Sequence, residues 1–185
     1  MATISYAFGI SLDGYIEDAD GGFGWSAPSD EAHRISNEQT RAASTFLFGR
    51  HIYEIMEEYW TSAAARGDGT PVEAEFARLY VETPRIVFSD TLASVGEGCR
   101  LVRRADARAE VERLKRETAG TMAIAGAALA ASMIDLIDDF RLLVYPVAVG
   151  GGKPFFPAVR EALDLTLVES RTLDGGILYM HYERR

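Results

Sequence analysis

Residues 140–156 place an apolar segment directly before a glycine-rich loop. The segment reads Phe-Arg-Leu-Leu-Val-Tyr-Pro-Val-Ala-Val, and this composition favours a strand that is covered on both faces. Three glycines, Lys153 and Pro154 follow, and glycine lets a backbone turn sharply or approach a ligand closely. The pattern predicts a core strand that leads into a loop at a sheet edge, where many nucleotide cofactors bind.

This loop is not a phosphate-binding P-loop, although it contains Gly-Lys. That motif needs a glycine five residues before Gly-Lys and a serine or threonine after it. Val147 occupies the first position and Pro154 follows Lys153, so no hydroxyl is present to hold magnesium. A tight turn after a core strand remains the alternative interpretation.

Length and charge restrict the class of protein. A chain of 185 residues predicts one domain, residues 1–185, and 48% hydrophobic with 25% charged residues is typical of a globular protein. The formal net charge of -9 argues against nucleic acid as a partner, but it leaves room for a local basic pocket for one phosphate ligand. The single cysteine, Cys99, is expected to be a small buried or half-buried residue, and it can form neither an intramolecular disulfide nor a cysteine-based metal cluster. Because no long apolar run and no basic leader occurs, we expect a cytoplasmic protein without a membrane segment.

Apolar periodicity alternates between strand and helix along the chain. Strands are predicted over residues 4–10, 45–49, 85–89, 121–125, 139–149, 165–173 and 177–183. Helices are predicted to begin at Ser29, to lie near residues 50–65, 73–81 and 106–118, and to begin at Gly126. Asp-Gly-Gly at 174–176 joins the last two strands as a hairpin. This order predicts a three-layer α/β fold with a mostly parallel sheet and an antiparallel hairpin at its C-terminal edge.

Three junctions between a strand and a helix carry small or polar residues. They are Phe48-Gly49-Arg50, Phe88-Ser89-Asp90-Thr91 and Ala125-Gly126-Ala127. In a parallel sheet these junctions lie on one edge, where helix N-termini favour pyrophosphate. Arg50 and Ser89 add a guanidinium and a hydroxyl suited to a phosphate monoester. Together they predict a nucleotide site.

No cofactor-independent catalytic constellation competes with this site. His33, His51 and His181 show no ligand spacing, and no Gly-x-Ser-x-Gly motif occurs. Asp138 and Asp139 are either a cation site or, as paired acids before a strand more often are, solvated or capping groups. Glu57 and Glu58 are expected on a solvated helix face, and no metal site is predicted.

The ordered motifs resemble the dihydrofolate reductase-like superfamily over nearly the whole chain. They are Ser-Leu-Asp-Gly at 11–14, Phe-Gly-Arg-His-Ile-Tyr-Glu at 48–54, Ile-Val-Phe-Ser at 86–89, Ala-Gly-Ala-Ala-Leu at 125–129 and the run 138–156. The run 138–156 is the most specific of them. The similarity is closest to stand-alone relatives of the C-terminal reductase domain of bifunctional riboflavin-biosynthesis deaminase-reductases.

The resemblance implies NADPH as hydride donor and a homodimer as the usual assembly. Carried over by motif, Gly49, Arg50 and Ile52 lie against the cofactor phosphates, and Ser89 approaches the adenosine 2′-phosphate. The segment made of Ala125, Gly126, Ala127, Ala128 and Leu129 wraps the pyrophosphate and nicotinamide side. Asp13 lies at the mouth of the substrate pocket.

Several positions depart from this family pattern. Tyr15 stands where the pyrimidine reductases often carry lysine, so a substrate phosphate or ribose loses a cation. Ile52 replaces a common threonine and leaves only its backbone N–H, and the zinc motif of a deaminase is missing. Asp13 is interpreted as a substrate hydrogen-bonding or proton-relay residue, or equally as an Asx turn before Gly14. Tyr15 and Trp25 stack on a flat substrate ring or anchor the loop.

Two functions from different classes follow. The first is an NADPH-dependent reductase that acts on a pterin-like or pyrimidine-riboside-like small molecule, with 5-amino-6-(5-phosphoribosylamino)uracil reductase-like activity implied by the resemblance. The second is a nucleotide- or pterin-binding module on the same fold without turnover. Two departures from the family pattern motivate it: Tyr15, and Ala125 at the first position of the paired-glycine junction. Fold alone does not define function.

Overall fold

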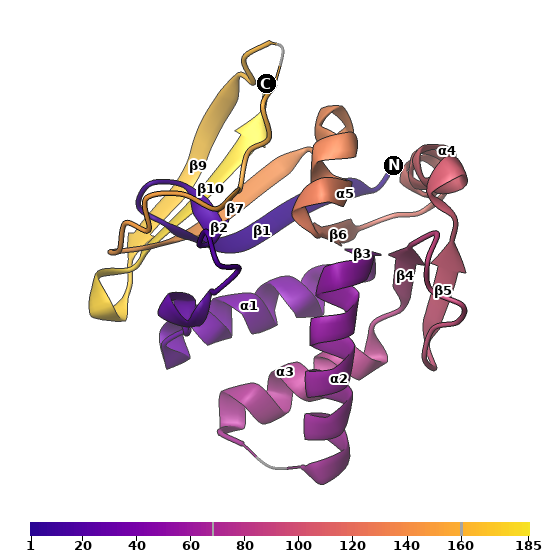
Figure 1. Cartoon of the computed structure of the whole chain (residues 1–185), viewed down its shortest axis with the longest axis horizontal. Coiled ribbons are helices and arrows are strands. Elements are labelled where there is room, and N and C mark those ends of the chain that lie inside the picture. Colours follow the sequence, from indigo (N-terminus) through magenta and orange to yellow (C-terminus); the bar gives the residue numbers. More distant parts are fainter. Residues whose placement is uncertain (68, 160) are drawn as a thin grey trace.

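One eight-stranded sheet runs through the molecule, with helices on both faces (Figure 1). The computed structural model describes residues 1–67, 69–159 and 161–185. The strands of this sheet are β1 (Thr3–Ser11), β3 (Ala43–Gly49), β4 (Arg85–Phe88), β5 (Cys99–Val102), β6 (Thr121–Ala125), β7 (Asp139–Tyr145), β9 (Leu165–Thr172) and β10 (Leu178–Arg184). They lie in the order β5-β4-β3-β6-β1-β7-β10-β9.

The sheet is parallel from β5 to β7 and antiparallel from β7 to β9. The predicted hairpin forms at Asp174–Gly176, where Gly175 and Gly176 both have positive φ angles that suit glycine. The prediction of a mostly parallel α/β sheet with an antiparallel C-terminal hairpin is therefore confirmed.

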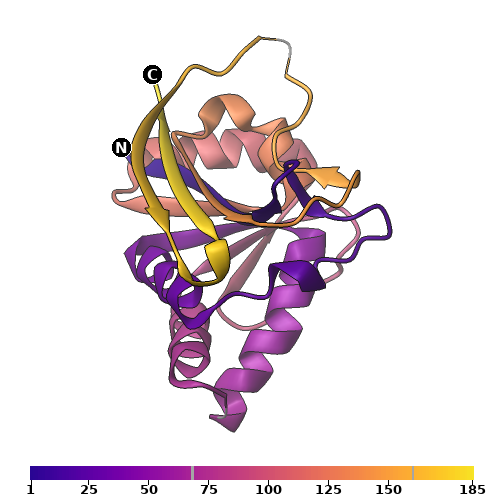
Figure 2. The same cartoon turned by 90° about the vertical axis from the view of Figure 1, so that its left-hand side faces the viewer.

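Five α-helices of the described residues complete the three layers. Helices α1 (Asp30–Ala42), α2 (Arg50–Arg66) and α3 (Pro71–Glu82) cover one face, and α4 (Arg104–Glu117) and α5 (Ala127–Ser132) cover the other (Figures 1 and 2). Short 3-10 helices lie at Gly24–Ser26 and Ile134–Leu136. Ser29 caps α1 as predicted, and a Thr70–Glu73 capping box starts α3 two residues before the predicted start.

The side-chain alternation of the strands directs apolar residues into separate cores on the two faces of the sheet. In β1, Ile4 and Tyr6 are fully buried in the core beneath α4 and α5. In β3, Leu47 joins that core, whereas Phe46 and Phe48 pack with α2 and α3 on the opposite face. This two-residue period is the property that made β1 recognisable in the sequence.

The long apolar segment ends as a strand earlier than predicted. Strand β7 stops at Tyr145 rather than at residue 149, because Pro146 has no N–H to continue the ladder. The chain then loops back, and β8 (Lys153–Pro154) pairs with β2 (Tyr15–Glu17) in a separate two-stranded sheet. Strand β5 was not predicted, since its four residues show little alternation.

The paired acids at the start of β7 hold the sheet together. Asp138 accepts hydrogen bonds from the Lys115 ammonium and the backbone N–H of Ile4, each at 2.7 Å. Asp139 accepts from the Ser5 hydroxyl at 2.6 Å and from Arg141 Nε at 2.9 Å. Both carboxylates thus act as hydrogen-bond acceptors for neighbouring backbone and side-chain groups, which agrees with the interpretation of the two acids as capping groups. The described residues contain no cluster of three or more groups able to hold a metal ion.

Candidate active site

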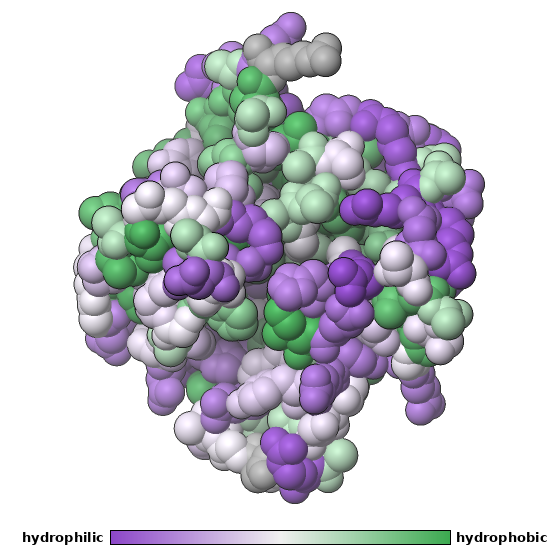
Figure 3. Space-filling view, viewed as in Figure 1, coloured by the Kyte–Doolittle hydropathy of each residue, from purple (hydrophilic) through white to green (hydrophobic). Residues whose placement is uncertain are grey.

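A cavity of about 610 Å³ opens at the carboxyl ends of the parallel strands. Figure 3 shows a hollow near the middle of this face, between apolar and hydrophilic side chains. Its walls come from β1, β2, the junction of β3 with α2, the end of β4, the start of α4, helix α5 and β8. The lining residues include Phe8, Ile16, Glu17, Phe23, Gly49, Arg50, His51, Ile52, Met56, Phe88, Arg104, Gly126, Ala127, Ala128, Leu129 and Lys153.

Two glycine junctions approach each other at the floor of the cavity. Gly126 has a φ of +105°, and a Cβ there would lie 3.3 Å from both Cα and N of Gly49. Any larger residue at position 126 would fill this space and strain the backbone. The two junctions thus leave a cradle in which a ligand can approach the main chain.

Helix α2 directs its N-terminus into this cradle. Gly49 is its N-cap and offers no side-chain cap, so the first N–H groups of the helix keep no partner within the helix. Residues 49–52 all line the cavity. A helix of this length carries partial positive charge at its N-terminus, which favours a phosphate group.

The cavity is cationic although the chain is acidic. Arg50, Arg104 and Lys153 line it, and Glu17 is the only carboxylate among the described lining residues. The whole chain has a formal net charge of -9. This local excess of cations favours an anionic ligand.

The structure brings together most of the predicted cofactor-binding residues. Gly49, Arg50, Ile52, Gly126, Ala127, Ala128 and Leu129 all line the main cavity. Ala125 instead lines an adjoining chamber of about 200 Å³. Phe8, Ile52 and Met56 line both spaces, so the cavity and the chamber share a wall.

Ser89 lies outside the described lining of the cavity. It is 3% exposed, and its hydroxyl accepts the backbone N–H groups of Thr91 and Leu92 at 3.2 and 3.1 Å. The hydroxyl therefore shapes the turn after β4. The guanidinium that reaches the cavity on this side belongs to Arg104, at the start of α4.

Asp13 also lies outside the cavity lining, where it anchors the glycine-rich loop. Its carboxylate accepts the N–H groups of Val149 and Gly150 at 3.1 and 2.7 Å. A hydrogen bond from Ser11, followed by these backbone hydrogen bonds, lowers the pKa of Asp13 below its usual value. A carboxylate held in its charged form is poorly suited to deliver a proton.

Tyr15 and Trp25 serve as loop anchors. The N–H of Tyr15 donates to the Ser11 hydroxyl at 3.0 Å, and Tyr15 pairs with Pro154 between β2 and β8. Trp25 packs edge-on against Tyr145, with ring centroids 6.2 Å apart. Neither ring is part of the cavity lining that the structure describes.

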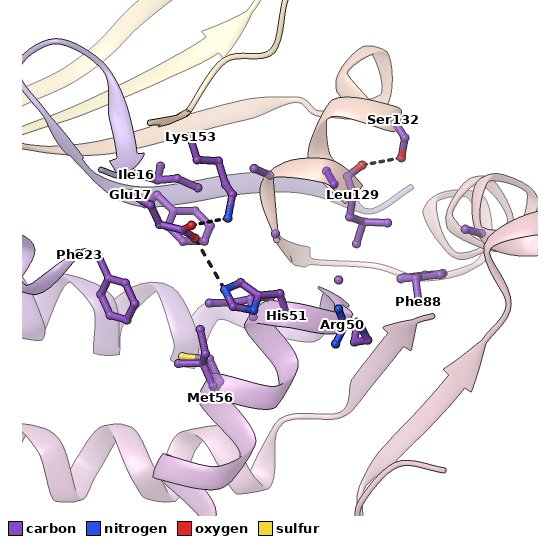
Figure 4. A pocket seen from close by; sticks show the side chains of 18 of the residues that line it. Ile16, Glu17, Phe23, Arg50, His51, Met56, Phe88, Leu129, Ser132 and Lys153 are labelled. Carbon is purple, nitrogen blue, oxygen red and sulfur yellow. Dashed lines mark hydrogen bonds and ion pairs between the residues drawn. The ribbon is translucent and has the colours of Figure 1, made fainter. Parts of the chain in front are cut away.

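A line of three titratable side chains closes the opposite end of the cavity from Arg104. Lys153 Nζ donates to one carboxylate oxygen of Glu17, and His51 Nε2 lies 4.0 Å from the other oxygen (Figure 4). The Glu17 side chain is 16% exposed, whereas His51 is 62% exposed. None of the three was singled out as a site residue from the sequence, because β2, β8 and α2 meet only in the fold.

The adjoining chamber has a different character. Aromatic rings of Phe8, Phe46, Phe48 and Phe76 surround it, and Arg141 is the only charged residue in its described lining. Ser36, Gln39, Thr40 and Tyr179 supply its polar groups. This combination suits a small, flat molecule with a few polar substituents.

Solved structures with the same architecture define the class of fold as dihydrofolate reductase-like. A "Putative riboflavin biosynthesis protein" from Shewanella sp. PV-4 is 22% identical with a TM-score of 0.71, covering 100% of this chain and 99% of the other. Dihydrofolate reductase from Enterococcus faecalis, complexed with NADP(H) and RAB-propyl, is 15% identical with a TM-score of 0.64, covering 99% and 96%. A deaminase/5-amino-6-(5-phosphoribosylamino)uracil reductase from Thermotoga maritima is 14% identical with a TM-score of 0.69, covering all of this chain and 57% of its own.

Within this class, the chain belongs to the RibD C-terminal domain family, whose model matches residues 2–179. The uncharacterized protein YyaP of Bacillus subtilis (strain 168) is 26% identical over 94% of this chain and 90% of its own length. YwjB of the same organism is also 26% identical, over 95% and 94%. The predicted family is therefore confirmed. Across the described residues, no helix is both long and apolar enough to cross a membrane.

Proposed function

We propose that this protein is an NADPH-dependent reductase that transfers a hydride to a pterin-like or pyrimidine-riboside-like small molecule. The observation that carries the proposal is the cationic cavity built on the α2 N-terminus and the Gly49–Gly126 cradle. An apolar chamber adjoins it, so a cofactor and a flat acceptor would share the walls formed by Phe8, Ile52 and Met56. Membership of a reductase-like family supports the same activity.

The residues present fit such a cofactor. The α2 N-terminus and Arg50 would hold phosphate groups, and Arg104 would add a second guanidinium. Gly126 keeps open the space that any Cβ would occupy. When bound, NADPH supplies the hydride, while the protein binds, orients and excludes water.

The experiment that tests the proposal is an NADPH titration followed by turnover. We expect saturable NADPH binding, measured by fluorescence, and NADPH oxidation with at least one member of a panel of pterins, pyrimidine ribosides and small carbonyl compounds. An absence of saturable binding up to millimolar NADPH would end the proposal. Binding without any turnover would favour the alternative of a binding module.

Arg50 should select NADPH over NADH. Its guanidinium lines the cavity and pairs with Glu54 at 2.9 Å on the same helix. Arg50→Ala should weaken NADPH binding roughly tenfold to a hundredfold, since a charge-assisted hydrogen bond contributes about 1.5–3 kcal/mol, with a smaller loss for NADH. Arg34→Ala, an exposed arginine in α1 paired with Asp30, is the control. Equal losses for both cofactors would place Arg50 on the pyrophosphate instead of the 2′-phosphate.

We also propose a homodimer, formed through the C-terminal edge of the sheet. Strand β9 is the free edge, and its Leu167 and Val168 side chains are each 51% exposed. Antiparallel pairing of two β9 strands about Ser170 would place Glu169 of each opposite Arg171 of the other. Tyr145, in the predicted strand 139–149, is buried against Trp25 within one chain, which favours a role in folding rather than in assembly.

Sedimentation at micromolar concentration tests this assembly. We expect a dimer for the natural chain and a monomer for Leu167→Lys, because a charge on the paired edge opposes strand addition. Leu12→Lys, at an exposed leucine outside β9, should remain dimeric. A monomeric natural chain would refute the dimer and leave the proposed reductase activity standing.

A further inference from the structure

Hydride transfer to a C=N or C=O group leaves a nitrogen or oxygen that must gain a proton. Among the described residues that line the cavity and the adjoining chamber, the arginines cannot release a proton, because they remain charged in proteins. Burial raises the pKa of Tyr179, so that phenol is a weak proton donor. Lys153, Glu17 and His51 are the titratable groups that remain.

We propose that Lys153 is the proton donor of the reductase, with Glu17 as its positioning residue and His51 as its link to solvent. This inference rests on the proposed function and adds the chemical role of one end of its cavity. The acceptor it implies is a small molecule whose reducible C=N or C=O group accepts a hydrogen bond from an ammonium.

The backbone fixes Lys153 at the cavity wall. Lys153 pairs with Glu17 across the β2–β8 ladder, and Phe155 N–H donates to the Gly14 carbonyl at 3.0 Å on the same strand pair. The preceding Gly152 packs so closely that a Cβ would lie 2.0 Å from the Glu17 carbonyl oxygen. Asp13 holds the other end of the loop at Val149 and Gly150.

Glu17 orients the ammonium and leaves it able to donate again. An ammonium has three N–H donors, and Glu17 engages Lys153 through one carboxylate oxygen. The other oxygen faces the exposed His51 imidazole at 4.0 Å. The remaining charges nearby are directed elsewhere: Arg50 pairs with Glu54, and Asp18 accepts the N–H groups of Asp20 and Gly22.

The surroundings suit this reaction. Phe8, Ile16, Phe23 and Met56 line the cavity beside the three groups, as Figure 4 shows for the last three. As the acceptor carbon gains the hydride with its electron pair, Lys153 gives one proton to the attached nitrogen or oxygen, so the substrate gains two electrons and two hydrogens. The neutral amine then regains a proton from solvent through Glu17 and His51. Lys153 also brings a positively charged group to the cavity, which Tyr15, at the position where the pyrimidine reductases often carry lysine, does not.

The chain offers a matched pair of variants, because Lys115 and Lys153 are its only lysines. Lys153→Arg keeps the charge and the partner Glu17 but cannot release a proton. Lys115→Arg makes the same change in the remote Lys115–Asp138 pair. With the acceptor found in the panel, Lys153→Arg should slow single-turnover hydride transfer roughly 100-fold to 10,000-fold and leave the NADPH Kd within about threefold. Lys115→Arg should change neither.

Two further readouts separate proton donation from structure. Ethylamine should restore part of the rate of Lys153→Ala, whose shortened side chain leaves room for the amine, and should leave the rate of the natural chain unchanged. Glu17→Gln should lower the rate less than Lys153→Ala and shift its pH profile, because Glu17 acts through Lys153. Hydride transfer by Lys153→Arg within threefold of the natural rate, or a lost NADPH affinity in that variant, would overturn the proposal.

A readout without turnover keeps this inference distinct from the proposed function. In Lys115→Arg, reductive methylation with ¹³C-formaldehyde labels two kinds of group: the amine of Lys153, which is then the single lysine, and the N-terminal amine. The NMR signal of Lys153 should shift when NADPH saturates the protein. No NADPH binding would contradict the proposed function itself, whereas bound NADPH with an unchanged Lys153 signal would contradict only the proton-donor assignment.

Discussion

Replacing Arg85 by methionine should lower the free energy of unfolding by about 3–5 kcal/mol, the range for breaking a buried ion pair from one side. The Arg85 side chain is 2% exposed. Its Nη1 donates to the carbonyls of Tyr80 at 2.7 Å and Thr83 at 3.1 Å at the end of α3, and Nη2 donates to the Glu97 carbonyl at 2.7 Å. Methionine fills similar space but leaves these carbonyls without a donor. Urea denaturation measures the loss.

Glu57 explains why the loss is expected to be large. Its Oε2 lies 3.3 Å from Arg85 Nε and accepts the Tyr80 hydroxyl at 2.8 Å. Without Arg85 this carboxylate stays half-buried and uncompensated. Arg85→Met combined with Glu57→Gln should therefore recover part of the stability.

An exposed arginine in α3 provides the control. Arg78 pairs with Glu82 at 2.7 Å, and both side chains are more than half exposed. Such i,i+4 pairs contribute about 0.3–0.5 kcal/mol, so Arg78→Met should be nearly neutral. A similar loss for both variants would show that burial of Arg85 has no special energetic role.

Gly152→Ala should separate the β2–β8 sheet and displace Lys153. The Cβ would lie 2.0 Å from the Glu17 carbonyl oxygen and 2.6 Å from the Asp18 carbonyl carbon, and the φ of +135° is one that L-residues rarely adopt. Because the contacts are with backbone, no side-chain rotation relieves them. We expect a loss of about 1–3 kcal/mol from the strain alone, and hydride transfer that falls as in Lys153→Arg.

Gly151→Ala is the matched control in the same loop. A Cβ at Gly151 meets no atom within 4 Å, and its φ lies outside the positive range. This variant should keep both stability and hydride transfer. Hydrogen exchange at the Phe155 amide, which donates to Gly14, reports whether the small sheet has opened. Unchanged protection in Gly152→Ala would contradict the predicted displacement.

The glycine junctions show which parts of the site could be predicted. Gly49, Arg50 and Gly126 were identified because glycine at the end of an apolar strand is a local signal. The parallel sheet then brings such ends to one edge, and all three line the cavity. Ser89 carried a similar signal, a small polar residue at the end of an apolar strand, but its hydroxyl accepts hydrogen bonds within its own turn.

Other residues had no local signal that could identify their role. Glu57 was expected on a solvated face beside Glu58, yet α3 and β4 bury it against Arg85. Arg104 was overlooked because an arginine at a helix start is common on protein surfaces. Cys99, expected to be buried or half-buried, is half-buried and accepts a hydrogen bond from Arg85.

The sequence by itself determined the order of most strands and helices, the alternation of β1 and the turn at Asp174–Gly176. These depend on hydrophobic period and on glycine conformation, which act over a few residues. Only the tertiary structure decided that Lys153 meets Glu17, 136 residues away in the chain, and that Asp13 holds the glycine-rich loop. Such pairings depend on where β2, β8 and α2 come to lie in space, and charged side chains carry no periodic signal that reveals their partners.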